Sequence, residues 1–419
     1  MTHAPARPSV TAPDELTSLE DYRRDVLVRI SALEPIELGL LEAHGCVLAE
    51  DVVADADVPA FVNSAMDGYA VASAGLDPDQ PLPLAGEVAA GRPFEEMLPP
   101  GAAVRIMTGA PLPEGADAVV PVEQADESDG EVRLHVTPRA GDHVRPAGGD
   151  VQAGTTALTA GRRLQAADIG MLAAVGRSRV LAHPRPRVAV IATGDELVEP
   201  GTALGPGQIH DANSFTLTAM AREAGAAATR SQIVGDDRRQ LSEAFEGALT
   251  NADLLLTSGG VSAGRYDYVK EVLAQVGDVA FHKVGMQPGM PQAFGFVGGE
   301  GSPRIPCFGL PGNPVSAFVS FEVLVRPALR RMQGRADLNR PRVTAVLEER
   351  VTSPPHKVSF LRVRLRRDGA HWLARLTGPQ GSGLLHSAVA ADGLAEVPVD
   401  RTELEAGEPV VVHLLVAPQ

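Results

Sequence analysis

Short apolar runs alternate with helical patterns over residues 185–334. The apolar runs occupy residues 188–192, 233–234, 254–256 and 307–310. The helical patterns occupy residues 214–223 and 239–249, begin again near 266, and run once more from 314 to about 331. This alternation predicts a mostly parallel sheet with helices on both faces. Ligands of such sheets bind beyond the carboxyl ends of the strands, so the polar residues at those ends are the first candidates for a site.

The flanking regions follow other patterns. Residues 51–147 contain short apolar pieces separated by Pro and Gly, which is typical of a small β-rich domain. Residues 15–50 and 148–184 favour helices, so the β-rich segment is expected to be inserted into a helical linking domain. In residues 335–419 apolar and polar positions alternate, as in Arg362–Arg366, where Val363 and Leu365 separate the arginines. This alternation predicts a small β domain or barrel in which one face of each strand is wet.

The expected fold class is therefore multidomain α/β plus β. Its expected parts are a disordered tail (1–14), the helical linking domain (15–50 and 148–184), the β-rich insertion (51–147), the α/β domain (185–334) and the C-terminal β domain (335–419). A chain of 419 residues is long enough for several such cores.

Composition narrows the function and the compartment. The net charge of −16 argues against a general nucleic-acid binder. No apolar run is long enough for a membrane span, and the first residues lack the apolar core of a signal peptide, so we expect a cytoplasmic protein with no membrane partner. The two cysteines, Cys46 and Cys307, provide neither a disulfide framework nor a zinc site, and we expect both to be small buried residues.

Acidic residues follow three of the predicted strands. Glu196 follows the first strand, Asp236 the second, and Asp267 the loop after the third. Carboxylates grouped at one sheet edge suit Mg²⁺, which commonly binds one or two carboxylates together with substrate phosphates. Each acid could instead simply cap the helix that follows it.

Two loops at the same edge are rich in Gly, Ser and Pro. The first contains Ser258, Gly259, Gly260 and Ser262, and the second contains Pro311, Gly312 and Asn313. A loop of this kind between a strand and a helix places backbone N–H groups against an anion, although the second loop could equally be a rigid turn. The candidate phosphate partners are Arg145, Lys270, Lys283 and Arg304. No Ser or Cys lies in a recognisable nucleophile motif.

Taken together, these motifs resemble the molybdopterin molybdenumtransferase (MoeA) family, to which the E domain of gephyrin-type proteins is also similar. The resemblance spans about residues 16–415, and its motifs are at 63–70, 105–120, 145–150, 193–197, 236–237, 258–270 and 309–316. It implies an elongated, multidomain monomer in a homodimer, whose cleft combines the inserted domain of one subunit with the α/β domain of the other.

The resemblance also implies an activity. Molybdenum from molybdate would be inserted into adenylylated molybdopterin with release of AMP, in the presence of Mg²⁺. The implied catalytic residues are Asp67, Thr108, Glu196, Asp236 and Asp267, with Asp150, Glu196, Asp236 and Asp267 near the metal. The pterin would be held by Ser258, Gly259, Gly260, Ser262, Lys283, Pro311, Gly312 and Asn313. Molybdopterin adenylyltransferase and the proteins that receive the cofactor are the implied partners.

One loop departs from the family pattern. Many members have Lys-Pro-Gly-Lys-Pro, or at least its first lysine, where this chain has Gln287-Pro288-Gly289-Met290-Pro291. Gln287 can donate hydrogen bonds, but without the assistance of a charge. Two alternatives stay open: a molybdopterin adenylyltransferase, which needs neither flanking region, and a scaffold paralogue that binds molybdopterin without turnover.

Overall fold

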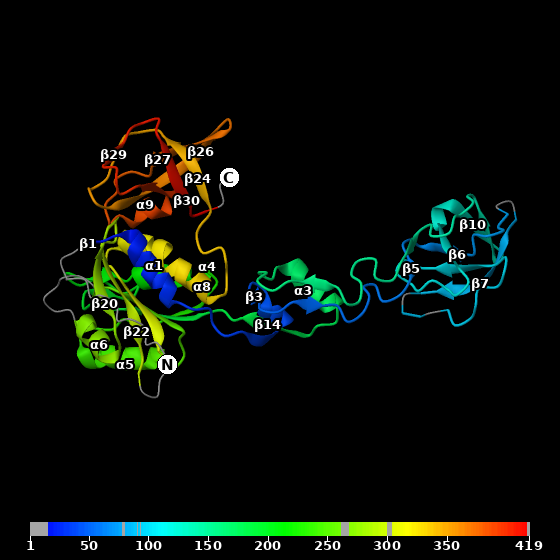
Figure 1. Cartoon of the computed structure of the whole chain (residues 1–419), viewed down its shortest axis with the longest axis horizontal. Helices are drawn as coiled ribbons and strands as arrows, with labels where there is room; N and C mark the ends of the chain where they lie inside the picture. The colour runs from blue at the N-terminus through cyan, green and yellow to red at the C-terminus, as the bar shows by residue number, and fades with distance from the viewer. Residues whose placement is uncertain are drawn as a thin grey trace, which may run out of the picture. The chain divides into compact units, whose positions relative to one another are not determined.

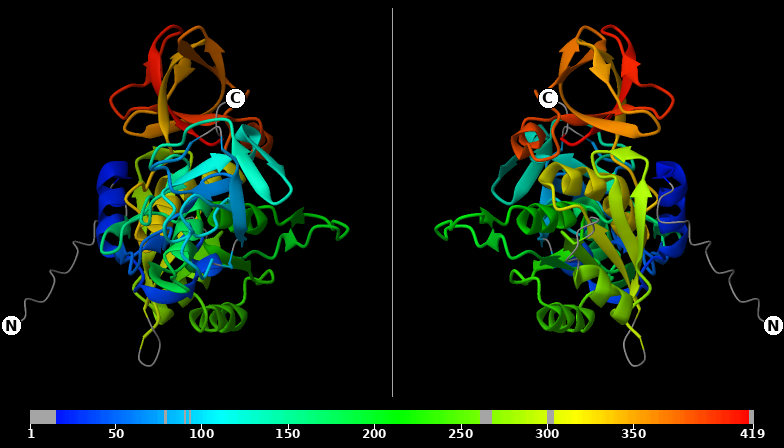
Figure 2. Two further views of the ribbon diagram at one scale, coloured as in Figure 1. Left: turned by 90° about the vertical axis from the view of Figure 1, so that its right-hand side faces the viewer. Right: turned by 90° about the vertical axis from the view of Figure 1, so that its left-hand side faces the viewer.

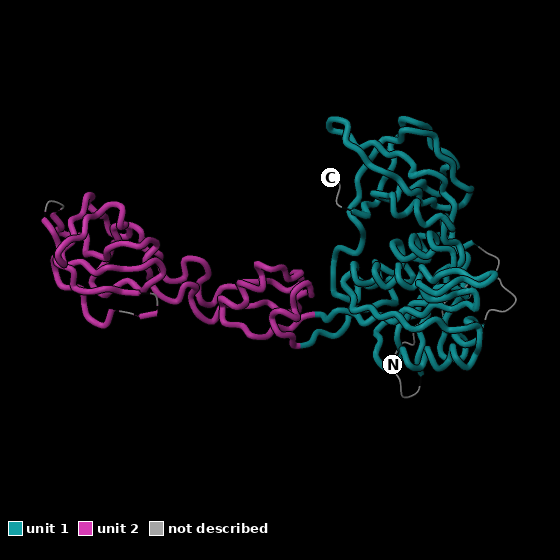
Figure 3. Tube along the Cα trace, turned by 180° about the vertical axis from the view of Figure 1, so that it is seen from behind, with its two compact units in different colours: residues 1–36, 183–419 teal, residues 37–182 magenta. Residues whose placement is uncertain are grey.

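The apolar run at 188–192 forms strand β15 (Arg187–Ala192), an inner strand of a seven-stranded sheet. The computed structural model describes residues 16–77, 80–89, 91–92, 94–260, 268–299 and 304–416. The chain divides into two compact units. Unit 1 comprises residues 1–36 and 183–419, and unit 2 comprises residues 37–182 (Figure 3).

The sheet of unit 1 is mostly parallel, as the sequence predicts. Its order is β1 (Leu16–Thr17), β20 (Ala280–Val284), β22 (Pro291–Val297), β23 (Ile305–Leu310), β19 (Leu254–Ser258), β15 and β18 (Ala227–Arg230). β22 is antiparallel to both of its neighbours, and the remaining pairs are parallel. The carboxyl ends of β15, β19 and β23 therefore lie side by side.

Helices pack on both faces of this sheet (Figure 1). They are α1 (Leu19–Arg29), α4 (Asn213–Glu223), α5 (Arg238–Leu249), α6 (Tyr268–Val276), α7 (Pro314–Ser320) and α8 (Arg326–Met332), with a π-helical stretch, Phe321–Val325, between the last two. Val188 and Val190 of β15 join the core under α1, α4 and α8, whereas Ile191 joins the core under α5 and α6. Because both faces are covered, the strand is apolar from Val188 to Ala192, and only its first residue, Arg187, is exposed.

Two elements differ from the sequence expectation. The second strand of the pattern is β18 (Ala227–Arg230), and the predicted run at 233–234 forms only a single bridge, between Val234 and Thr193. Helix α1 belongs to unit 1 rather than to the region around 148–184, because Tyr22 and Val26 are buried in the same core as the sheet. Ser18 caps this helix, since its hydroxyl accepts a hydrogen bond from the Asp21 N–H at 3.0 Å.

The C-terminal part of unit 1 contains a closed ring of five strands. They are β24 (Arg342–Leu347), β26 (Val358–Asp368), β27 (His371–Leu376), β28 (Gly393–Val397) and β30 (Pro409–Leu414). The order β26-β27-β24-β30-β28 closes through a β26–β28 pairing (Figure 2). Short elements accompany the ring: β21 (Met286–Gln287), β25 (Val351–Thr352), α9 (Leu385–Val389) and β29 (Glu403–Leu404). The barrel predicted for this region is present.

Arg362 is an exception to the alternation on β26. The pattern places it on a wet face, but its side chain is fully buried. Its guanidinium donates to the Ser387 hydroxyl at 3.1 Å and to the Gly381 carbonyl at 3.2 Å. Burial lowers the pKa of Arg362 to about 10. The loop before α9 covers this arginine, and strand alternation alone could not show that.

Unit 2 contains the β-rich segment. Its six-stranded sheet has the order β10 (Ala125–Ser128), β11 (Glu131–Leu134), β7 (Leu82–Val88), β8 (Ala103–Ile106), β6 (Gly68–Val71) and β9 (Ala118–Pro121), with η1 (Val122–Gln124) after β9. Alternate residues of β6 enter two cores: Tyr69 and Val71 face one, and Ala70 faces the other. Covering both faces explains why this strand is buried along its whole length.

The rest of unit 2 is built from two stretches that lie far apart in the sequence. Its elements are β2 (Ile36–Gly39), α2 (Leu40–Ala43), β3 (Val47–Leu48), β4 (Val52–Val53), β13 (Thr156–Leu158), α3 (Ala166–Ala174) and β14 (Arg179–His183). Their apolar side chains, such as Leu48 and Leu172, share one core. Short pairs complete the chain: β5 (Asn63–Ser64) with β12 (Val144–Arg145), and in unit 1 β16 (Leu197–Val198) with β17 (Ile209–His210).

Gly247 offers a test of the helix assignment. It lies inside α5, is exposed, and a Cβ added there would contact nothing within 4 Å. Gly247→Ala is therefore expected to stabilise the protein by about 1 kcal/mol in urea unfolding, because glycine is a poor helix former. Gly225→Ala is the opposite case, since Gly225 has φ +98° and its Cβ would lie 2.5 Å from the Gln333 Oε1 atom. Equal effects of the two variants would contradict the assignment.

Candidate active site

The turn after β15 places Glu196 at the carboxyl edge of the sheet. The Gly194 N–H donates to the Val234 carbonyl at 3.2 Å, and this bond ties the turn to the chain that leads to Asp236. Gly194 has φ +147°, and a Cβ there would lie 2.6 Å from Oε2 of Glu196. Glycine is needed because the Glu196 carboxylate folds back over the backbone at this position.

Asp236 lies beside this turn. Its N–H donates to Oδ1 of Asp195 at 2.9 Å. Burial raises the pKa of the Asp236 carboxyl, and the charges of Asp195 and Glu196 raise it further. The structure therefore brings together two of the predicted acids, Glu196 and Asp236. Asp237 has another role, since its side chain accepts from the Gln240 N–H at 2.9 Å and caps α5.

The chemistry of this carboxylate group fits a magnesium ion. Burial is the main cause of the raised pKa of Asp236, and the charges of Asp195 and Glu196 add to it; a divalent cation would relieve this part of the shift. Among the described residues no group of three or more His, Cys, Asp or Glu could hold a metal by itself. Such a limited set is what Mg²⁺ commonly uses when substrate phosphates supply its other ligands.

A small cavity lies next to these acids. It has a volume of about 160 Å³ and is lined by Thr193, Glu196, Asn213, Ser258, Gly259, Gly312 and Asn313, among others. The Asn213 side-chain amide donates to the Ser258 hydroxyl at 2.8 Å and to the Gly312 carbonyl at 2.7 Å. Asn213 thus joins the two loops that were predicted to hold the pterin.

The first of these loops approaches its neighbours closely. The Gly259 N–H donates to the Leu310 carbonyl at 3.1 Å. Gly260 has φ +69°, and a Cβ there would lie 2.4 Å from Cγ2 of Val269 on α6. Ser262 and Asp267, two other predicted site residues, lie outside the described residues.

The second loop leads into α7. Pro311 is buried, whereas Gly312 and Asn313 are exposed, and Pro314 occupies the first turn of the helix. The sequence left an anion-binding loop and a rigid turn as equal alternatives for this segment. The Val315 N–H in the first turn of the helix is not free for an anion, since it donates to the Ser382 carbonyl at 2.9 Å. The loop before α9 therefore uses one of the donors.

The basic side chains of unit 1 that were predicted to bind phosphate lie away from this cavity. Lys283 is exposed near the carboxyl end of β20, two strands away from β23 in the sheet order. Lys270 lies 5.2 Å from the ring centre of Phe281, and Arg304 pairs with Asp278 at 2.5 Å. None of these three side chains lines the cavity.

Unit 2 places Asp67 and Thr108 in direct contact. Oδ1 of Asp67 accepts from the Thr108 N–H at 2.6 Å and from its hydroxyl at 2.8 Å. These two hydrogen bonds lower the pKa of the Asp67 carboxyl, the backbone bond contributing more. A stable carboxylate therefore lies at the end of β8.

Asp150 and Arg145 line a separate cavity of unit 2, with a volume of about 600 Å³. Asn63 and Gly109 also line it, and Phe61 on its wall is 46% exposed. The Asp150 N–H donates to the Val58 carbonyl at 3.0 Å, which fixes the backbone of this acid. Two of the resembling motifs, at 63–70 and 145–150, thus meet around one cavity.

The contact between Asp67 and Thr108 can be tested by measuring the pKa of the Asp67 carboxyl. We expect the pKa of the Asp67 carboxyl in the wild-type protein to lie below the usual range for aspartate. Thr108→Val removes the hydroxyl bond but keeps the backbone bond, so the pKa should rise only part of the way back. Carboxyl-detected NMR of the two proteins measures this pKa. An unchanged Asp67 pKa in Thr108→Val would contradict the contact.

Sequence reasoning missed Asn213 and the buried network around Asp211. The Asp211 carboxylate is 1% exposed, accepts from the Ser214 N–H at 3.0 Å and lies 3.5 Å from Arg230. The available signal was the run Asp211-Ala212-Asn213-Ser214 just before a helical pattern, since these residue types cluster at helix starts. The bridge from Asn213 to two distant loops had no such signal.

Both predicted buried cysteines, Cys46 and Cys307, are buried and free. Burial raises the pKa of the Cys307 thiol to about 12, which argues against a nucleophilic role. In the part of the chain that the structure describes, every helix is too short or too polar to cross a membrane.

Comparison with known families covers nearly the whole chain. Residues 17–176 match the MoeA N-terminal region (domain I and II), residues 189–331 a probable molybdopterin binding domain, and residues 344–415 the MoeA C-terminal region (domain IV). The fold and the strand-edge site thus define a multidomain enzyme built around a domain of the molybdopterin-binding type.

Curated relatives agree with these matches. The chain is 44% identical over 403 residues to molybdopterin molybdenumtransferase 2 of Mycobacterium tuberculosis, covering 94% of this chain and 98% of the relative. It is 37% identical over 391 residues to molybdopterin molybdenumtransferase of Haemophilus influenzae, covering 90% and 94%. A solved structure, the molybdopterin biosynthesis moea protein from Pyrococcus horikosii, has a TM-score of 0.78 at 33% identity and covers 96% of this chain and 100% of that one. The chain belongs to the molybdopterin molybdenumtransferase (MoeA) family.

Proposed function

We propose that this protein inserts molybdenum from molybdate into adenylylated molybdopterin and releases AMP. The observation that carries the proposal is that Glu196 lines the cavity between the Ser258–Gly259 and Gly312–Asn313 loops, with the charge of Asp236 near that of Glu196. A dinegative oxyanion and a phosphoanhydride both need a cation and hydrogen-bond donors near them. This edge of the sheet offers carboxylates for the cation, and amide and hydroxyl groups for the substrate.

Within this proposal each residue acts on the cation, on a binding loop or on the substrate. Glu196 and Asp236 would hold Mg²⁺, which when bound neutralises phosphate charge and polarises the phosphoanhydride. Asn213 keeps the two loops at a fixed separation through its bonds to Ser258 and Gly312. Ser258, Gly259, Gly260, Pro311, Gly312 and Asn313 would hold the pterin substrate. Attack of a water oxygen on the adenylyl phosphorus would form one P–O bond and break the P–O–P bridge, giving AMP and molybdopterin with its own phosphate. Attack by a molybdate oxygen would instead give adenylyl molybdate, which water then hydrolyses to AMP and molybdate.

Other predicted assignments stay proposals on the strength of the resemblance. Asp67 and Thr108 would act near an oxyanion, Asp150 near the metal, and Lys283, Ser262 and Asp267 near the substrate. We also propose a homodimer, a cytoplasmic location, and contacts with molybdopterin adenylyltransferase and with proteins that receive the cofactor. The mass in solution, measured by light scattering, tests the homodimer.

Single-turnover release of AMP tests the function directly. Purified protein is mixed with adenylylated molybdopterin and Mg²⁺, with and without molybdate. Release of AMP that requires molybdate, together with transfer of molybdenum to the pterin, supports the proposal. Formation of adenylylated molybdopterin from ATP and molybdopterin would instead show an adenylyltransferase. Binding of the substrate without AMP release would show a scaffold, the alternative that the uncharged Gln287 and Met290 favour.

A further inference from the structure

A second cavity of unit 1 lies away from the proposed site. It has a volume of about 660 Å³ and lies between α1, the chain around 338–342 and the barrel strands β26, β28 and β30. It shares no lining residue with the cavity beside Glu196. Any ligand of this second cavity is therefore additional to the substrates of the proposed reaction.

One wall of this cavity is apolar. Phe360 and Val323 are almost fully buried beneath it, and Leu27 borders it from α1. At its mouth Val28 is 71% exposed and Val399 is 53% exposed. Exposed aliphatic side chains that continue into an apolar wall are typical of a surface that binds the apolar part of a ligand.

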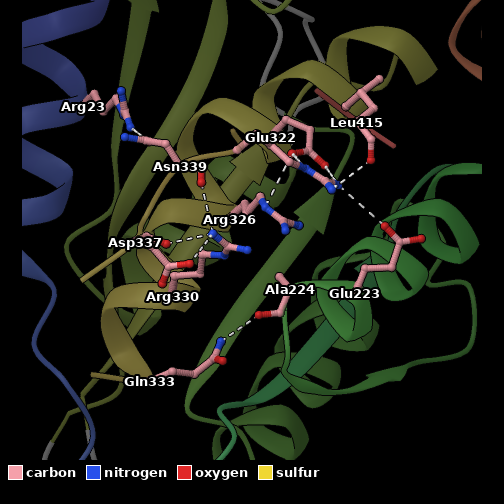
Figure 4. Close-up of polar contacts among 11 residues, drawn as sticks. Arg23, Glu223, Ala224, Glu322, Arg326, Arg330, Gln333, Asp337, Asn339 and Leu415 are labelled. Carbon is pink, nitrogen blue, oxygen red and sulfur yellow. Dashed lines mark hydrogen bonds and ion pairs between the residues drawn. The ribbon is translucent and has the colours of Figure 1, made fainter. Parts of the chain in front are cut away.

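The cavity is also lined by arginines that are only partly compensated. Arg23 on α1 is half-buried, and its Nε atom has no hydrogen-bond partner among the described residues. Its guanidinium contacts the side-chain oxygen of Asn339, an uncharged group (Figure 4). Burial lowers the pKa of Arg23 and the nearby charge of Arg342 lowers it further, whereas the nearby charge of Glu396 raises it. Two arginines thus lie near one another in the cavity lining, with one carboxylate near them.

Two of the three carboxylates that line the cavity have close partners, and the third is Glu20. Glu322 binds Arg340 through two hydrogen bonds of 2.9 Å, and Arg340 also donates to the Leu415 carbonyl at 2.9 Å (Figure 4). Glu396 lies 2.6 Å from Nε2 of His413; this hydrogen bond is the main cause of its lowered pKa, to which the charges of Arg342 and Arg23 add. Arg340 is therefore paired within the protein, whereas Arg23 and Arg342 form no ion pair in the described structure and are only partly offset by the more distant charge of Glu396.

We propose that this cavity binds an organic anion, with a carboxylate or phosphate group between Arg23 and Arg342 and an apolar body against Val323 and Phe360. Arginine suits this role because its guanidinium donates in pairs to carboxylate and phosphate oxygens. The net charge of −16 repels anions from the protein as a whole, so these arginines create a local exception. The proposal goes beyond the proposed function and does not depend on it.

Binding of 8-anilinonaphthalene-1-sulfonate, an anion on an apolar ring system, tests the proposal. Fluorescence titration of the full chain should show saturable binding of one molecule per chain. Arg23→Met and Arg342→Met keep the apolar stem and should each weaken binding about tenfold or more, as expected for loss of a charge-assisted bond. Arg366→Met is the matched control, since Arg366 is exposed and pairs with Glu348 away from the cavity; it should leave binding unchanged.

A substitution of an exposed residue at the mouth of the cavity tests the proposal without an effect on folding. Val28→Glu places a negative charge on an exposed position and should weaken binding, whereas Leu41→Glu, at a residue that is 85% exposed in unit 2, should not. Competition separates the parts of the ligand: octanoate should displace the probe at a concentration at least about tenfold lower than inorganic phosphate does. If octanoate and phosphate displace the probe at the same concentration, the proposed apolar part of the ligand is wrong. If Arg23→Met, Arg342→Met and Arg366→Met bind the probe with equal affinity, the proposed site is wrong. AMP release by Arg23→Met should match the wild type, which keeps this test distinct from that of the proposed function.

Discussion

Asp236→Asn is expected to lower the rate of AMP release about 100-fold or more. The substitution keeps the shape of the side chain and removes one of the two carboxylates that would hold the cation at the strand edge. Losing one preorganised electrostatic group from a reacting centre typically has an effect of this size. Single-turnover release of AMP at saturating Mg²⁺ measures it.

The same substitution should leave the protein at least as stable as the wild type. The raised pKa of Asp236 means that the folded protein favours the neutral carboxyl. Its contribution to stability is therefore present below the usual aspartate range and is lost as the pH rises through the raised pKa. Asparagine is neutral at every pH, so the melting temperature at neutral pH should be unchanged or higher. A loss of activity without a loss of stability would identify a functional carboxylate.

Asp237→Asn is the matched control for this experiment. It removes the neighbouring charge, but asparagine caps α5 as well as aspartate does, through the same bond to the Gln240 N–H. We expect turnover close to that of the wild type. If Asp236→Asn also turns over like the wild type, Asp236 has no part in the mechanism.

Asn213→Asp is expected to give the second large effect, a fall in kcat/KM of about 100-fold. The wild-type amide donates to Ser258 and to the Gly312 carbonyl at 2.8 and 2.7 Å. A carboxylate of the same shape cannot donate, so it would face the Gly312 carbonyl oxygen and add a negative charge beside the substrate phosphates. Steady-state kinetics should show most of the change in KM, because Asn213 acts on the positions of the binding loops.

Two comparisons make this result specific. Asn251→Asp changes an exposed asparagine of the same unit in the same way and should leave KM unchanged. Asn213→Ala removes both bonds without adding charge, and its KM should lie between the wild type and Asn213→Asp. A larger change in kcat than in KM would place Asn213 at the reacting atoms and contradict a positioning role.

Local patterns predicted much of the fold. The continuous apolar run of β15 is visible within a few residues, because it depends only on the burial of one strand. The antiparallel strand β22 was not predicted, since no local signal shows which strands it will lie between.

The candidate site was predicted in part for the same reason. Parallel strands that end at one edge bring Glu196, Asp236, Ser258 and Gly312 into one region, and the order of the elements is enough to show this. The bridge made by Asn213 joins residues 45 and 99 positions away. Its partners depend on how the loops fold back over the sheet, and the sequence around Asn213 does not contain that information.

The sequence by itself determined the alternation of strands and helices, the strand-edge position of the acids and the resemblance to a family. Only the tertiary structure decided that α1 packs with unit 1, that Arg362 is buried on a strand that looks half-wet, and that Arg23 and Arg342 line one cavity. The physical reason is the range of the interactions. Periodicity reports which face of one element avoids water, whereas the pairing of charges and the covering of a face depend on other chain segments, from the loop before α9 that covers Arg362 to segments far along the sequence.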